Sequence, residues 1–144
     1  MEPRTGRGGA DLTMHRTLAA AAVYFAIVFS LAFALGIVRT LLVAPRTGDV
    51  IAVLIETPLI LLVSWFAARR CAQRFAVPAR APDRLAMGLV AFSLLMAVET
   101  ALGVLLFARP LEQQLAAFAT PAGAIGVLAQ VAFGFMPLLA ARLR

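Results

Sequence analysis

Four long apolar runs constrain what this chain can fold into. A helix needs about 20 mostly apolar residues to cross a bilayer, because its backbone polar groups find no partner in lipid except within the helix itself. Runs that meet this requirement occupy most of the sequence: 17–44, 50–68, 85–107 and 122–141. We therefore expect an all-α membrane protein, an antiparallel bundle of four transmembrane helices.

The composition excludes most other classes of protein. Of the 144 residues, 62% are hydrophobic and 14% are charged, whereas a soluble domain has about 25% charged residues. One cysteine cannot build a disulfide framework. His15 is the single histidine, so neither a metal cluster nor a Ser-His-Asp or Cys-His set is available. We expect no metal, no cofactor and no enzymatic activity.

The segments between the runs carry turn and helix-end signals. Pro45 is expected to end the first span, and Asp49 to cap the second. The segment 109–119 has apolar residues at helical spacing, so it is either a short helix in the outer interface or a plain connecting loop. Pro58 lies inside the second span and Pro137 inside the fourth, where neighbouring helices must satisfy the freed carbonyls.

The arginines predict the orientation. Ten of the 13 basic residues lie in the N-terminal arm 1–16, the loop 69–84 and the tail 142–144. Short loops rich in arginine stay on the cytoplasmic side, so both termini are expected in the cytoplasm. The absence of lysine suggests a GC-rich bacterial genome, and hence the bacterial inner membrane.

The first span also has a feature of a cleavable signal peptide. Ala32, Phe33 and Ala34 form a small-x-small tripeptide after a basic arm and an apolar run. The run is longer than the apolar region of a usual signal peptide, and cleavage would leave three spans with poor charge balance. We therefore expect the first span to be retained.

Each predicted span contains one strongly polar residue. These residues are Arg39, Glu56, Glu99 and Gln130. The rise of about 1.5 Å per residue places all of them roughly 8 to 12 Å below the outer ends of their helices. A charged side chain at a helix centre costs about 2.5 to 3.5 kcal/mol, so these residues should face protein or water. We predict one buried polar layer, with Thr57 and Thr100 beside it.

Small residues accompany this layer. In the fourth span Ala122, Gly126, Gln130 and Gly134 recur every four residues, a pattern that lets helices approach closely. Gln130 is therefore expected on the packed face of its helix.

The charges of the layer favour a site for a proton or a small ligand. Two carboxylates and one guanidinium are neutral together if one glutamate holds a proton, and a low dielectric favours that state. Such a site could bind a proton or a small polar or cationic ligand, as in a small transporter. In the alternative interpretation the layer only locks helices together, in an accessory or assembly subunit of a larger membrane complex.

The loop 69–84 is the strongest basic segment. Arg69, Arg70 and Arg74 are candidates for binding anionic lipid head groups, although such loops are most often topology determinants. The expected partners are the lipid bilayer and a second copy or another membrane subunit. Nucleic acid is not expected, because the positive charge is divided among three short segments.

Overall fold

The computed structural model describes residues 7–143, and every regular element in that range is helical. The elements are α1 (Arg7–Val38), the π-helical turn η1 (Arg39–Val43), α2 (Ala44–Thr47), α3 (Asp49–Arg74), α4 (Ala81–Leu105), α5 (Leu111–Phe118) and α6 (Pro121–Arg142). Four continuous helical stretches are long and apolar enough to cross a membrane: Gly9–Thr47, Asp49–Arg74, Ala81–Leu105 and Pro121–Arg142. The predictions of an all-helical chain and of four apolar spans are confirmed.

The first long helix does not end at Pro45. Proline has no N–H, and its ring clashes with the carbonyl four residues earlier, so an ordinary α-helical turn is unfavourable there. The chain instead widens into η1, in which the Ala44 N–H bonds to the Arg39 carbonyl five residues back. The helix then continues as α2 and ends at Gly48, whose φ of 82° favours glycine.

The start of α3 also differs from the expectation. Its N-cap is Gly48, and no side chain caps it. Asp49 is instead the first residue of the helix, where its carboxylate interacts favourably with the positive end of the helix dipole.

The segment between α4 and α6 contains the short helix α5, so the helical part of the first interpretation of 109–119 is confirmed and a plain connecting loop is wrong. The next helix, α6, begins with a side-chain cap: the Thr120 hydroxyl accepts a hydrogen bond of 3.0 Å from the Gly123 N–H.

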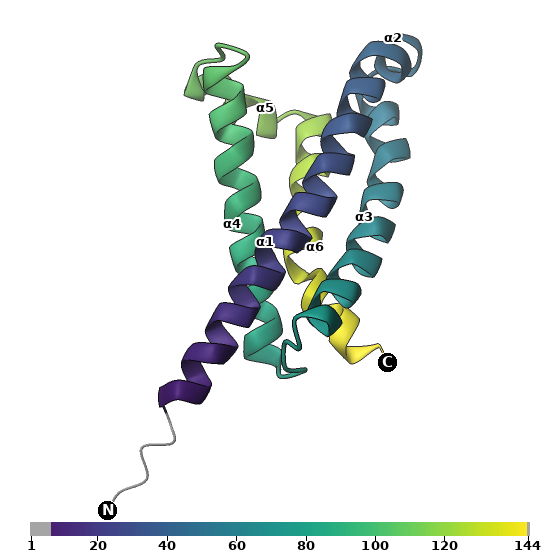
Figure 1. The fold of residues 1–144 in the computed structure, drawn as a ribbon. Helices are drawn as coiled ribbons and strands as arrows, with labels where there is room; N and C mark the ends of the chain where they lie inside the picture. The colour runs from purple at the N-terminus through teal and green to yellow at the C-terminus, as the bar shows by residue number, and fades with distance from the viewer. Residues whose placement is uncertain (1–6, 144) are drawn as a thin grey trace, which may run out of the picture.

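The four long helices form a ring in which α3 packs against α1 and α6, and α4 packs against the same two helices. Figure 1 shows that the start of α1, the end of α6 and the α3–α4 connection lie at one end, which we call the termini end. The opposite end, where α2 and α5 lie, is the α5 end. Across this ring of helices, from α1 to α6, the Tyr24 hydroxyl donates a 2.9 Å hydrogen bond to the Phe133 carbonyl. The aromatic side chains of Tyr24 and Phe133 also stack, with their centroids 4.5 Å apart.

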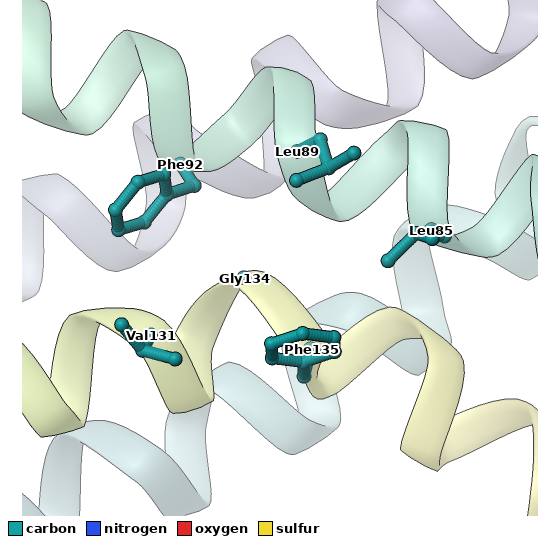
Figure 2. A pocket seen from close by; sticks show the side chains of 6 residues that line it. All are labelled: Leu85, Leu89, Phe92, Val131, Gly134 and Phe135. Carbon is teal, nitrogen blue, oxygen red and sulfur yellow. The ribbon is translucent and has the colours of Figure 1, made fainter.

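A close helix crossing joins α4 and α6 near the termini end. A Cβ added to Gly88 would collide with the carbonyl of Gly134, so this crossing requires glycine at position 88. Gly126, from the same predicted stripe, has nothing within 4 Å of an added Cβ. Of the small residues that recur along α6, Gly134 is therefore closely packed and Gly126 is not. Beside the crossing is an open apolar pocket of about 150 Å³ (Figure 2), lined by Leu85, Leu89, Phe92, Val131, Gly134 and Phe135.

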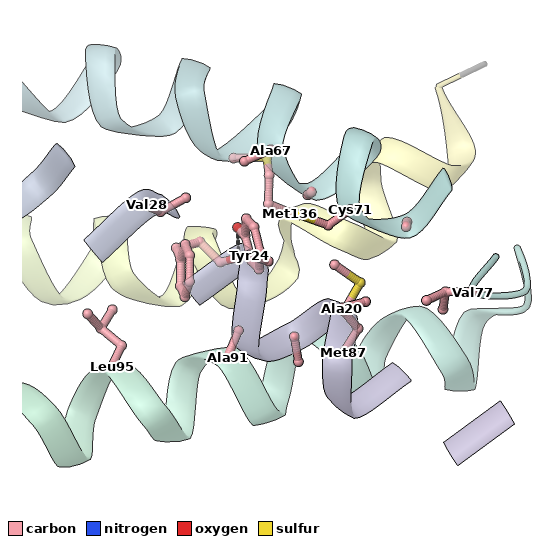
Figure 3. Packing of buried hydrophobic residues seen from close by; sticks show 14 residues of the cluster. Ala20, Tyr24, Val28, Ala67, Cys71, Val77, Met87, Ala91, Leu95 and Met136 are labelled. Atoms are coloured by element: carbon pink, nitrogen blue, oxygen red, sulfur yellow. Dashed lines mark hydrogen bonds between the residues drawn. The ribbon is translucent and has the colours of Figure 1, made fainter. Parts of the chain in front are cut away.

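The buried core is concentrated at the termini end (Figure 3). It contains small residues and a few large ones from all four long helices, including Ala20, Tyr24, Val28, Ala67, Ala68, Met87, Ala91 and Phe133. The α3–α4 connection is held there by Arg84, which is 4% exposed and donates hydrogen bonds to the carbonyls of Pro78 and Val77.

The α5 end is open by comparison. Between residues 30 and 60 and between 96 and 130, the buried residues are Ala52 and Val53. An added Cβ would meet nothing within 4 Å at either Gly36 on α1 or Gly126 on α6. The bundle is therefore packed at its termini end and loose at its α5 end.

Candidate functional site

The four polar residues of the spans form two separate pairs. Arg39 Nε lies 2.6 Å from Glu56 Oε2, which joins the first long helix to α3. Gln130 Nε2 donates a 2.6 Å hydrogen bond to Glu99 Oε2, which joins α6 to α4. Among residues 7–143, no hydrogen bond or ion pair connects the Arg39–Glu56 pair with the Glu99–Gln130 pair.

The two pairs lie at different depths along the helices. The contact between Tyr24 and Phe133 gives a common level for α1 and α6. From that level, the Cα atom of Arg39 lies about 22 Å toward the α5 end along its helix, and that of Gln130 about 5 Å. The sequence predicts similar depths for the four polar residues because it measures each depth from the end of an apolar run. The difference arises because the first helical stretch extends about 34 Å from Tyr24 to its end at Thr47, whereas α6 extends only about 18 Å from Phe133 to its start at Pro121.

The Arg39–Glu56 pair is a charge-compensated contact between two helices. The side chains are 30% and 13% exposed, respectively. Arg39 Nε has no hydrogen bond of good geometry, so the attraction to Glu56 is mainly electrostatic. Arg39 is also the first residue of η1, and π-helical turns are frequent at functional sites. The pair fixes the π-helical turn against α3.

The Glu99–Gln130 pair has no positive charge. No ion pair within residues 7–143 includes Glu99. Gln130 Oε1 is buried and has no hydrogen-bond partner. A buried acceptor without a donor costs about 1 to 3 kcal/mol. The pair therefore presents a carboxylate and an unused amide oxygen, two acceptors that a cation or a protonated group can satisfy.

Among residues 7–143, neither of the two threonines predicted beside the layer forms a hydrogen bond to one of the pairs. The Thr57 hydroxyl donates to the Val53 carbonyl at 2.8 Å, one turn back in its own helix. Thr100 is exposed, and its carbonyl accepts a 3.4 Å hydrogen bond from Gln114 of α5. Gln114 also covers Gly103. Sequence analysis missed this role of Gln114, for which the amphipathic pattern of 109–119 was the available signal.

The three lipid head-group candidates lie near the end of α3, and all are exposed. Arg70 and Arg74, together with Gln73, line a pocket of about 220 Å³. Arg69 is not among its lining residues. The last basic residue of the segment 69–84, Arg84, is buried in the fold and supports the loop.

Neither pocket described above contains a member of the two pairs. Among residues 7–143, no three histidine, cysteine, aspartate or glutamate side chains lie close enough together to hold a metal ion.

Comparisons with protein-family models, with curated proteins and with solved structures found no match to this chain. The class of the protein therefore follows from its own structure. Four helices of this length and apolarity define a multi-span helical membrane protein.

Proposed function

We propose that this chain is an antiparallel four-span protein of the bacterial inner membrane that binds a proton or a small cation at Glu99 and Gln130, as a small transporter does. It performs no catalytic reaction. Both termini and the α3–α4 connection lie in the cytoplasm. The arginines of 69–84 and of the two terminal segments support this orientation, since cytoplasmic loops are rich in arginine.

One observation carries the proposal: a buried amide oxygen without a donor lies beside a carboxylate without a basic partner. Within the apolar layer, an isolated ionised carboxylate is costly and takes up a proton or pairs with a cation. If Glu99 is protonated, its hydroxyl can donate to Gln130 Oε1 once the amide is rotated by half a turn. A proton on Glu99 or a bound cation would each give Gln130 Oε1 the partner that it lacks.

The uneven packing of the bundle supports access to this pair from one side. At the α5 end few side chains are buried, and Gly36 and Gly126 face open space. At the termini end the stacked rings of Tyr24 and Phe133 belong to the closed core. In this proposal water and small cations reach Glu99 from the α5 end, and the core blocks their passage to the other side.

In this proposal the Arg39–Glu56 pair has a different role. Its charges compensate one another, so Glu56 needs no proton to be stable in the membrane. The predicted four-residue layer thus divides into one titrating pair and one structural pair.

The test is infrared difference spectroscopy of the full-length protein in lipid vesicles during a pH step. We expect the C=O band of a protonated carboxyl in an apolar site, lost in Glu99→Gln and retained in Glu56→Gln. The two variants remove the same charge, so each controls for the other. A pH-sensitive dye inside the vesicles then reports whether protons cross. A band that persists in Glu99→Gln would contradict the proposal.

The open α5 end also favours the second candidate, an accessory or assembly subunit. A helix of a partner subunit could pack against Gly36 and Gly126, where nothing now lies within 4 Å of an added Cβ. In that case Glu99→Gln leaves the infrared spectrum unchanged. Gly36→Leu and Gly126→Leu then change the mass of the detergent-solubilised complex, measured by light scattering.

A further inference from the structure

We infer that Arg70, Gln73 and Arg74 form a binding site for the phosphate of an anionic phospholipid head group. These residues line a pocket of about 220 Å³ on the last turns of α3. The site is independent of the proposed function, because it lies at the termini end and Glu99 lies on another helix.

The spacing of the residues suits a single ligand. Arg70 and Arg74 are four residues apart, so their side chains lie one above the other on the same face of α3. Gln73 lies next to Arg74 and adds an amide with two donor hydrogens. A phosphate accepts hydrogen bonds from the paired N–H groups of guanidinium in a fork geometry.

The charge of the pocket is not compensated by the protein. The ion pair formed within residues 7–143 is that between Arg39 and Glu56, so no carboxylate there pairs with Arg70 or Arg74. The pocket lining contains two guanidinium groups and no acidic side chain. An anion is therefore the complementary ligand.

The depth of the site matches that of lipid phosphates. The apolar part of α3 from Val50 to Ala68 is about 28 Å long, close to the thickness of the hydrocarbon layer of about 30 Å. Arg70 then lies about 3 Å beyond the apolar layer, and Arg74 about 9 Å beyond it. The head-group region on each side is about 5 to 7 Å thick, so the Cα atom of Arg70 lies near its middle and that of Arg74 about 2 to 4 Å beyond its outer edge. The long arginine side chains can reach from both positions to a phosphate in this region.

The neighbouring surface suits the lipid tails. Phe66 lies one helical turn before Arg70 and is 62% exposed. Leu62, a further turn back, is 55% exposed. A lipid whose phosphate lies between Arg70 and Arg74 can therefore place its acyl chains along an apolar strip of the same helix. This continuity favours a membrane lipid over a soluble phosphate as the ligand.

The test is intact-complex mass spectrometry of the purified full-length protein in detergent, with phosphatidylglycerol and phosphatidylcholine of identical tails. We expect tighter binding of phosphatidylglycerol. The double variant Arg70→Gln with Arg74→Gln should lower this preference about tenfold or more. The matched control, Arg69→Gln with Arg80→Gln, removes the same charge from exposed positions outside the pocket and should lower the preference clearly less than the pocket variant does.

Three results would overturn the inference. The first is equal binding of phosphatidylglycerol and phosphatidylcholine by the unmodified protein. The second is an equal loss of the preference for phosphatidylglycerol in the pocket variant and the control variant, which would indicate an unspecific effect of charge. The third is displacement of bound phosphatidylglycerol by inorganic phosphate at millimolar concentration, which would make the site one for a soluble anion. Because all of these variants keep Glu99 and Gln130, none of these results bears on the proton site.

Discussion

The contact between Arg39 and Glu56 makes an asymmetric prediction about stability. Arg39→Leu leaves Glu56, a short side chain that is 13% exposed, as an uncompensated charge within the apolar layer. Glu56→Leu leaves Arg39, whose long side chain can extend toward the α5 end and reach water. The arginine substitution should therefore be the more damaging of the two.

The magnitudes follow from the cost of charge in a span. A charged residue at a helix centre costs about 2.5 to 3.5 kcal/mol, and less near the ends. We expect Arg39→Leu to lower the free energy of unfolding by about 2 kcal/mol and Glu56→Leu by about 1 kcal/mol. The double variant contains no unpaired charge, so it should lie within about 1 kcal/mol of the unmodified protein.

The assay is unfolding of the purified protein in mixed micelles by SDS, followed by circular dichroism. Acidic pH should relieve the defect of Arg39→Leu, because a protonated Glu56 carries no charge. The reasoning is refuted if the losses of the two single variants simply add in the double variant, or if Glu56→Leu is the more damaging single change.

Three further predictions concern the packed end and the orientation. Gly88→Ala should destabilise the protein by about 1 to 3 kcal/mol, because the added methyl group collides with the backbone of α6. Gly126→Ala is the matched control and should be neutral or slightly stabilising; equal effects would argue against the crossing. Tyr24→Phe should cost about 1 kcal/mol in the same SDS assay, since it removes a buried hydrogen bond to a carbonyl of α6. An unchanged midpoint would show that this bond contributes nothing. In a Cys71→Ser background, a cysteine at the exposed position Ala79 should react with impermeant maleimide only in inverted vesicles. Reaction in intact cells would reverse the proposed orientation.

The positions of the spans were predictable from the sequence because lipid permits few alternatives to a helix. The same reasoning failed at Pro45, where proline was interpreted as the end of a helix. Rules for helix ends do not include the wider turn by which η1 accommodates that residue. In lipid the helix gains by continuing, since every backbone group must find a partner along the chain.

The candidate site was predictable residue by residue, but not as an arrangement. Hydropathy gives the approximate depth of Arg39 or Glu99 in a helix, and says nothing about which neighbouring helix each residue faces. That information depends on the order of the helices around the ring. It also depends on where they cross, which is set by contacts such as Gly88 against Gly134.

Because the bundle is tightly packed at the termini end and loosely packed at the α5 end, the first long helix is held at one end and free to tilt at the other. Tyr24 lies near the pivot in the packed core, and Arg39 lies about 22 Å away along the same helix. A tilt of about 10° at the pivot would move the far end of that arm by about 4 Å. A small change of tilt is therefore enough to widen or narrow the α5 end by more than the diameter of a water molecule.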